Sequence, residues 1–471
     1  MTKQLSAGAF LLLLPTLQLL LSLAVQQGSA FTVPAPLLHH PAHAHYRTEF
    51  PTATNRRHAG VLTGRFGFLL QLIYDDEINE TIDGMVRFSD LAYAFANIRD
   101  IVKKNDLVEG TPKEGKGVKF NTPALIITQG GAQPIDQNRL FRYPITAAAI
   151  ERFLELNRNL LKQDPAGGNV SFDDTNKSMS SNDLPRMPIE DLMTTFRQSI
   201  DGEFLDYDDK DTTNAGLVYS LFKSRTKKRF TVAFRGTVGP KDILTDAKFA
   251  LKTTPEPLKG DADDINIKLH RGFASYLFDD REELLEDGTL RTRSRFDRIL
   301  AALKECYEEL PADERDDWDL CVTGHSLGGG LANIFAYSVA QTQRDVSYLD
   351  KVTAITIAAP VVGDKGYNKA HQGLEREGRL RHIRISNNGD VVPSQPFPGY
   401  TQNGVNLHLF ADKIMELDYR NTKNVFTQVN FSMLDKHKLT EYRKRLTLSD
   451  NKEILSRKIS DLYEVAEDFT N

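Results

Sequence analysis

The order of predicted elements indicates an α/β fold, in which helices cover both faces of a mostly parallel central sheet. From residue 216 onward, short runs rich in Val, Ile and Phe alternate with helical stretches. The predicted strands cover residues 230–234, 318–323, 352–358 and 380–385. The clearest helix covers residues 327–340 and follows the second of these strands. Strands that alternate with helices in this way are typical of parallel sheets.

The composition is that of a globular protein that can bury a large core. Of the 471 residues, 40% are hydrophobic and 26% are charged, which excludes disorder throughout the chain. The net charge is −5, and the basic residues are dispersed among acidic ones instead of forming a stripe. Nucleic acid is therefore not the expected partner.

The N-terminus predicts a secretory signal peptide over residues 1–30. Lys3 precedes an apolar run at residues 10–25, and small residues follow before the expected cleavage site after Ala30. A membrane anchor is the alternative, but Pro15 interrupts the run, which is shorter than the ~20 residues of a spanning helix. The expected location is the secretory pathway, with an extracellular or lumenal destination.

Residues 31–60 are expected to form a leader that is processed or unstructured. They are rich in His and Pro, and Glu49 is their only acidic residue. A signal peptide followed by Phe31 and an acid-poor stretch resembles the two-part presequence that carries proteins into the secondary plastids of algae. A plastid is therefore the alternative location.

The rest of the chain is divided into three predicted regions. Residues 61–214 form an N-terminal helical region, with a helix near residues 85–102 and a flexible loop near residues 163–185. Residues 215–445 form the α/β domain. Residues 446–471 form a charged C-terminal helix or tail.

A sharp turn that presents a serine nucleophile is predicted at residues 324–328. The residues are Gly-His-Ser-Leu-Gly, with Ser326 in the centre, and this G-x-S-x-G pattern is common by chance. Here an apolar strand precedes it and a helix rich in Gly and Ala follows it, which is the context that such a turn requires. The pattern in this context predicts the α/β-hydrolase fold with Ser326 as nucleophile.

The expected acid is Asp390, because in this fold the acid follows the nucleophile and precedes the histidine base. Asp390 lies in a polar turn after the strand at residues 380–385, and ligands and catalytic groups gather at such strand ends. A structural Asp that only shapes the turn is the alternative for this residue. Asp364 is the rival acid, although it follows an earlier strand.

The expected base is His437, with His408 as the alternative. His437 lies at a polar junction before a C-terminal helix, where a ring can reach over the sheet edge. His408 lies in an alternating strand, where packing is its ordinary role.

The oxyanion hole requires two backbone N–H groups, and the sequence offers Leu327 and Thr237. Leu327 follows the nucleophile, and Thr237 follows Gly236 at the end of the strand at residues 230–234. The predicted chemistry needs no cofactor, and no metal site has the ligands that it would need. The two cysteines, Cys306 and Cys321, are expected to pack as thiols and not to form a disulfide.

Four ordered motifs together resemble the class 3 lipases, the fungal-lipase-like family. They are Phe-Arg-Gly-Thr at 234–237, Gly-His-Ser-Leu-Gly-Gly at 324–329, Asn-Asn-Gly-Asp-Val-Val-Pro at 387–393, and a late histidine at 437. The similarity spans residues 216–442. It implies a triad of Ser326, Asp390 and His437, with Thr237 and Leu327 in the oxyanion hole.

The resemblance also implies a serine-dependent hydrolase that cleaves the carboxylic esters of acyl lipids through an acyl-enzyme, as a triacylglycerol lipase does. A phospholipase A1 or galactolipase of the same family is the alternative, and so is an acyltransferase that excludes water. A catalytically silent hydrolase fold that binds lipid is the alternative of another class. Residues 238–253 are interpreted as an amphipathic lid that contacts a lipid interface, or as a packing helix. No feature indicates an obligate protein partner.

Overall fold

The computed structural model describes residues 78–104, 145–146, 203–208, 218–236, 251–253, 267–284, 289–342, 349, 351–394, 398–411, 416–418, 435–448, 458–459 and 462–463. All of them belong to one compact unit, residues 71–471. The predicted signal peptide, the leader, the loop near residues 163–185, Thr237 and most of the C-terminal tail lie outside the described residues.

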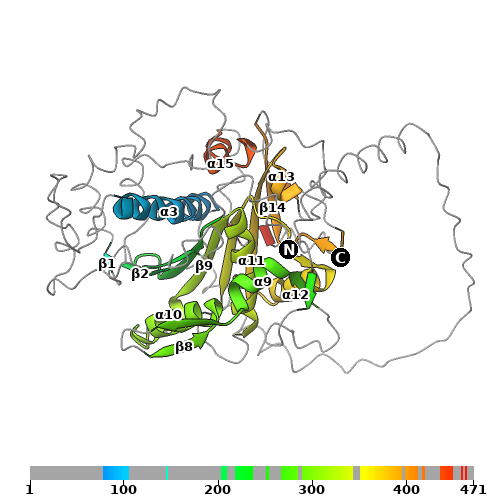
Figure 1. Cartoon of the computed structure of the whole chain (residues 1–471). Coiled ribbons are helices and arrows are strands. Elements are labelled where there is room, and N and C mark those ends of the chain that lie inside the picture. Colours follow the sequence, from blue (N-terminus) through cyan, green and yellow to red (C-terminus); the bar gives the residue numbers. More distant parts are fainter. Residues whose placement is uncertain are drawn as a thin grey trace, which may run out of the picture. The chain divides into compact units, whose positions relative to one another are not determined.

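A nine-stranded sheet forms the centre of this unit (Figure 1). Its strands in spatial order are β1 (Ile145–Thr146), β2 (Glu203–Asp208), β3 (Tyr219–Ser224), β4 (Arg229–Phe234), β9 (Asp319–His325), β10 (Val352–Ile357), β12 (Leu380–Asn387), β14 (Val405–Leu409) and β15 (Glu416–Asp418). The five strands from β4 to β14 run parallel, and the outer strands pair antiparallel. The predicted parallel sheet is confirmed, and the four predicted strands correspond to β4, β9, β10 and β12.

Helices cover both faces of the sheet, as predicted. One face packs against α9 (Arg271–Phe278), α10 (Arg295–Glu308), α11 (Leu327–Thr342) and α12 (Lys365–Arg376). The other face packs against α3 (Ile78–Lys104). There the hydroxyl of Thr323 on β9 donates a hydrogen bond to the Met85 carbonyl oxygen and shares another with the Ser89 hydroxyl. Because side chains alternate along a strand, Val322 of β9 points to the opposite face and joins the core under α11.

The core between β4, α10 and α11 is built from aromatic rings. Phe234 and Phe296 both contact Phe335 of α11, at centroid distances of 5.4 and 5.5 Å. Every residue of α11 from Gly328 to Gln341 is buried. A helix that is buried on all sides has apolar residues on all its faces, as most of α11 does. Each buried phenylalanine stabilises the fold by about 1.5–3 kcal/mol. This packing fixes the helix that follows Ser326.

Elements on both sides of residue 214 build the same sheet. β2 pairs with β3 in an antiparallel register, and Phe204 of β2 contacts Phe222 of β3 at a centroid distance of 4.4 Å. Phe88 of α3 also contacts Phe222, at 4.6 Å. The described parts of the N-terminal region therefore share a core with the α/β domain.

Short elements complete the described chain. They are the sheet β13 (Tyr400–Thr401), β11 (Gly363–Asp364), β6 (Lys268–His270) and β5 (Leu251–Thr253), the pair β7 (Arg281–Leu284) and β8 (Leu290–Arg293), the 3-10 turn η2 (Arg315–Asp317), and the helices α13 (Val391–Ser394) and α15 (Leu439–Leu446). Of residues 238–253, only β5 is described. Because β5 is a strand, neither a lid helix nor a packing helix extends through residues 251–253.

Two further findings concern the cysteines and the helices. Cys306 is half-buried, Cys321 is buried, and both are free thiols, as predicted. Burial raises the pKa of Cys306 to about 11, so this thiol stays protonated and unreactive near neutral pH. Within the described ranges, no helix is both long and apolar enough to cross a membrane.

Candidate active site

Ser326 lies in the tight turn between β9 and α11. Its φ of +58° is in the left-handed region, which is costly for a residue with a side chain. The turn is held by a 2.9 Å hydrogen bond from the Ser326 N–H to the carbonyl of Ile357. A Cβ atom at Gly324 would lie 2.3 Å from the Gly328 backbone, and one at Gly328 would lie 2.2 Å from the Phe234 oxygen. Both glycines are therefore required by close backbone contacts.

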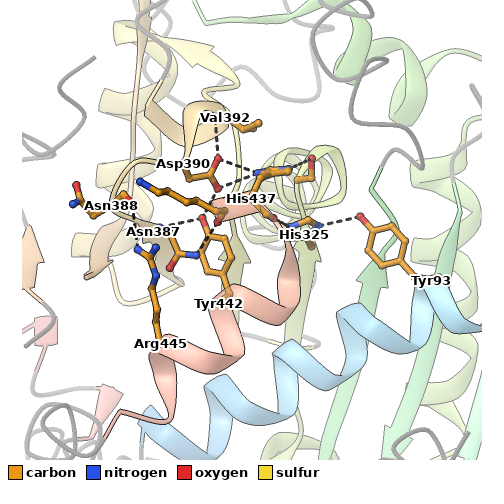
Figure 2. A network of polar contacts seen from close by, with 11 residues as sticks. Tyr93, His325, Asn387, Asn388, Asp390, Val392, His437, Tyr442 and Arg445 are labelled. Atoms are coloured by element: carbon orange, nitrogen blue, oxygen red, sulfur yellow. Dashed lines mark hydrogen bonds and ion pairs between the residues drawn. The ribbon is translucent and has the colours of Figure 1, made fainter. Parts of the chain in front are cut away.

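The structure brings Ser326, His437 and Asp390 together in one line of hydrogen bonds. Figure 2 shows His437 beside Asp390 in this line. The Oγ of Ser326 lies 2.8 Å from Nε2 of His437. Nδ1 of the same ring lies 2.9 Å from Oδ2 and 3.1 Å from Oδ1 of Asp390. A carboxylate accepts the Nδ1 proton, which leaves Nε2 free to accept the serine proton. This arrangement can activate the hydroxyl as a nucleophile.

Asp390 is fully buried, and its carboxylate is satisfied by donors besides His437. The Val392 N–H donates to Oδ1 at 3.0 Å, and the Tyr442 hydroxyl donates to Oδ2 at 2.6 Å. The phenol in turn accepts the Asn387 N–H at 3.0 Å. Burial, and then the charge of Asp390, raise the pKa of Tyr442 well above its usual range. Tyr442 therefore remains a donor to Asp390 at any working pH.

The backbone beside the His437 ring is also held by side chains. Nε2 of His325 lies 2.8 Å from the His437 carbonyl oxygen, and Nδ2 of Asn387 donates to the Lys436 carbonyl at 2.9 Å. Burial, and then the proximity of His437, lower the pKa of His325 to about 3, so this ring is neutral. Its Nδ1 lies 3.0 Å from the hydroxyl of Tyr93 on α3.

The sequence interpretation did not assign any role to Tyr93, His325, Asn387 or Tyr442. His325 occupies a variable position of the G-x-S-x-G pattern, and the other three lie in segments interpreted as packing or turn residues. No local signal places Tyr442 near the base, because residues in contact on a helix are three or four positions apart and Tyr442 follows His437 by five.

The two rival residues have structural partners elsewhere. Asp364 caps α12, because its Oδ1 accepts the N–H of Tyr367 at 2.9 Å, and it also accepts the N–H of Lys268 at 3.1 Å. His408 lies on β14, where its Nδ1 shares a 2.8 Å hydrogen bond with the Ser386 hydroxyl. The geometry therefore favours Asp390 and His437 over Asp364 and His408.

Leu327 is the first residue of α11, directly after Ser326. The first N–H groups of a helix lack intrahelical acceptors and carry the positive end of the helix dipole, which suits a developing oxyanion. Thr237 lies outside the described residues. Its neighbour Gly236 lies against the nucleophile, since a Cβ there would be 3.2 Å from the Ser326 Cβ.

In the described part of the chain, no cluster of three His, Cys, Asp or Glu side chains could hold a metal ion.

Comparison with known proteins identifies the family of this site. Residues 231–400, which contain Ser326 and Asp390, match the family described as Lipase (class 3). Phospholipase A1-II 4 of Oryza sativa subsp. japonica is 29% identical over 181 residues, which cover 38% of this chain and 43% of that protein. The chloroplastic phospholipase A1-Igamma2 of Arabidopsis thaliana is 31% identical over 173 residues, which cover 36% of this chain and 31% of that protein.

The matched region is only part of each relative, because this chain spans less than half the length of both proteins. A solved lipase from Rhizopus microsporus var. chinensis overlaps with 53% of this chain and 76% of its own, at 19% identity and a TM-score of 0.36. The fold assignment rests on the strand order of the sheet, and the family assignment rests on residues 231–400. Residues 231–400 of the chain are therefore similar to the class 3 lipase family.

Proposed function

We propose that this protein is a serine-dependent carboxylic ester hydrolase that cleaves acyl lipids through an acyl-enzyme. The observation that carries the proposal is the unbroken hydrogen-bond line from Ser326 through His437 to Asp390. Each heavy-atom distance in this line is within the range required for proton transfer between nucleophile, base and orienting acid.

In the proposed mechanism, Ser326 Oγ attacks the ester carbonyl carbon while His437 Nε2 takes the hydroxyl proton. Asp390 orients the ring and stabilises the imidazolium. The N–H groups of Leu327 and Thr237 bind the oxyanion. The bond to the leaving alcohol then breaks, and His437 returns the proton to that alcohol. Water then attacks the acyl-serine carbonyl while His437 takes a proton from it. The bond between the acyl carbon and Ser326 Oγ breaks, His437 returns the proton to Oγ, and the fatty acid is released.

The class of acyl lipid is a second part of the proposal. The two curated relatives reported above are named phospholipases A1, which supports a phospholipid ester as substrate. A triacylglycerol or a galactolipid is the alternative. Transient contact with a lipid interface follows from any of these substrates.

The first experiment labels the full chain with a fluorophosphonate probe. Wild type is expected to react, whereas Ser326→Ala and His437→Ala are not, because they remove the nucleophile and the base. Ser338→Ala is the matched control: this buried serine of α11 donates to the Ile334 carbonyl at 2.7 Å, and the variant should still react. A folded but unlabelled wild type would instead support a lipid-binding module. Full activity in His437→Ala would shift the role of base to His408.

The second experiment measures fatty acid release from phosphatidylcholine vesicles, triacylglycerol emulsions and galactolipid micelles. The expected order places the phospholipid first, and Ser326→Ala should lower the rate by ~10⁴-fold or more. If fatty acid were released fastest from triacylglycerol, the protein would instead be assigned as a triacylglycerol lipase.

The destination of the protein is also a proposal, based on residues 1–30. We expect export through the secretory pathway and cleavage after Ala30, with delivery to a plastid as the alternative. Fusing residues 1–60 to a fluorescent protein would distinguish the two compartments, and N-terminal sequencing of the mature protein should begin at Phe31.

A further inference from the structure

One helix outside the family match reaches the candidate active site. α3 precedes residues 231–400, yet its Tyr93 is buried beside the nucleophile turn (Figure 2). The Tyr93 hydroxyl lies 3.0 Å from Nδ1 of His325, and the two rings meet edge to face at a centroid distance of 5.9 Å. The family motifs give Tyr93 no role.

The geometry fixes the direction of each hydrogen bond in this contact. The His437 carbonyl oxygen can only accept, so Nε2 of His325 carries the ring proton and donates to it at 2.8 Å. Burial keeps the ring neutral, so Nδ1 has a free lone pair. The Tyr93 hydroxyl is therefore the donor to Nδ1. Loss of the Tyr93 hydroxyl would leave Nδ1 of His325 without its donor. The His325 ring could then rotate away from the His437 carbonyl, which its Nε2 contacts.

The Tyr93 oxygen also contacts the strand that leads to the oxyanion segment. Burial is the main cause that raises the pKa of Tyr93 above its usual range, so the phenol keeps its proton. A Cβ atom at Gly236 would lie 2.2 Å from the Tyr93 hydroxyl, so the phenol occupies the space beside this glycine. One phenol thus joins the ends of β4 and β9.

α3 is itself anchored on both sides of this contact. The Ser89 hydroxyl lies 3.3 Å from the Thr323 hydroxyl of β9, and Asp90 forms an ion pair with Arg443 of α15. α15 is the helix that begins directly after the His437 turn. α3 therefore links the strand that precedes the nucleophile to the helix that follows the base.

We propose that Tyr93 is a positioning residue for the reaction: it holds His325 so that the ring fixes the His437 carbonyl, and its hydroxyl fills the space beside Gly236. This proposal rests on the proposed hydrolase function. Tyr93 acts through His325 and Gly236, and it does not touch the reacting atoms. Because a base displaced by about 1 Å can lose up to about 10²-fold in rate, one buried hydroxyl can affect turnover strongly.

The test compares Tyr93→Phe with Ser89→Ala in the full chain, with p-nitrophenyl butyrate as substrate. Tyr93→Phe keeps the ring and removes only the hydroxyl, so kcat should fall by roughly tenfold while KM stays within about twofold. Ser89→Ala removes a different hydrogen bond between the same helix and the same strand, and its kcat should equal that of wild type. Variants are compared only where their melting temperatures match.

Substitutions of His325 separate positioning from simple packing. His325→Gln keeps an N–H donor for the His437 carbonyl and should retain more kcat than His325→Leu, which keeps none. In the His325→Leu background, Tyr93→Phe should cost less than about threefold, because two residues that act through one contact are not additive.

The outcomes distinguish this proposal from the proposed function. A wild-type chain that resists the fluorophosphonate probe would overturn the hydrolase function itself. A labelled wild type with equal kcat in Tyr93→Phe and Ser89→Ala would overturn only the positioning role. A change in KM alone, or full additivity of Tyr93→Phe and His325→Leu, would also overturn it.

Discussion

At the scale of single residues, the candidate acid has hydrogen-bond donors on both carboxylate oxygens. Asp390 is 0% exposed and accepts from Val392, Tyr442 and His437. A buried carboxylate without such donors would take up a proton, and it would then lose its charge. The three donors fix the carboxylate in the position from which it orients His437.

Removing one of these donors should weaken catalysis without unfolding the protein. In Tyr442→Phe, Asp390 loses the 2.6 Å hydrogen bond from the phenol. A hydrogen bond to a charged group contributes about 1.5–3 kcal/mol, so we expect kcat to fall by roughly 10- to 100-fold if the bond supports the transition state. The measurement is kcat for p-nitrophenyl butyrate hydrolysis.

Tyr367→Phe is the control for this variant. Tyr367 is equally buried, but its hydroxyl donates to Asn333 Oδ1 at 3.0 Å, on the other face of the sheet. Its loss should lower stability and leave kcat unchanged. If both variants lost the same activity, the effect of Tyr442 would be one of packing alone.

Sequence alone could predict the residues of the nucleophile line but not their supports. Ser326, Asp390 and His437 follow from a local pattern, a strand end and the order of the chain. The contact between Tyr93 and His325 joins residues 232 positions apart, and no periodicity within a single helix predicts such a partner. Tertiary contacts of this kind depend on how α3 is placed on the sheet, which only the structure describes.

At the scale of elements, the rival acid has a structural role that can be tested. Asp364 is the N-cap of α12, where its side chain accepts the N–H of Tyr367. Asp364→Ala should lower the free energy of unfolding by about 1 kcal/mol and leave fluorophosphonate labelling intact. Asp390→Asn should instead reduce labelling strongly. Equal labelling losses in the two variants would reopen the choice of acid.

The glycines of the helices offer a second test at this scale. A Cβ atom at Gly84 of α3 would meet no atom within 4 Å, so Gly84→Ala should stabilise the protein by about 0.5–1 kcal/mol in urea unfolding. Gly328→Ala in α11 is the contrasting variant, because its Cβ would overlap the Phe234 oxygen. It should lose folding or labelling. Destabilisation by Gly84→Ala would indicate that α3 packs more tightly at this position than the structure shows.

The predicted elements agree with the structure where the sequence pattern is long and apolar. The strands predicted at 318–323 and 380–385 are observed as Asp319–His325 and Leu380–Asn387, each extended at its C-terminal end. The antiparallel outer strands β2 and β15 are not predicted from the sequence, because short strands of mixed polarity are defined by their pairing partners and not by their own residues.

At the scale of the whole molecule, the parallel sheet explains why distant residues meet. His325 of β9 pairs with Ile357 of β10, which pairs with Ile385 of β12. The carboxyl ends of these three strands therefore lie at one edge, where Ser326 and Asp390 follow directly. His437 completes the line from the turn before α15. The proposed chemistry thus depends on strand register across the centre of the sheet.

The same packing leaves histidine rings buried without charge, which predicts that acid destabilises the fold. Burial is the main cause that lowers the pKa of His325 to about 3 and that of His382 well below 6.5. In the unfolded chain both rings take up protons below pH ~6.5. The unfolded state then binds more protons than the folded state, so the stability that is fully present above pH 6.5 falls as the pH decreases.

The expected slope can be measured in a window where few carboxyl groups titrate. Burial also lowers the pKa of His270 to about 4, so a third ring titrates in the same window. Each ring should contribute up to roughly 1.4 kcal/mol per pH unit, so the three together should remove on the order of 5 kcal/mol between pH 6.5 and pH 5. Urea unfolding at several pH values gives this slope. His382→Gln should reduce the slope by about a third, because one of these three titrating rings is gone. A stability that stays constant between pH 6.5 and pH 5 would show that the rings accept protons in the folded state.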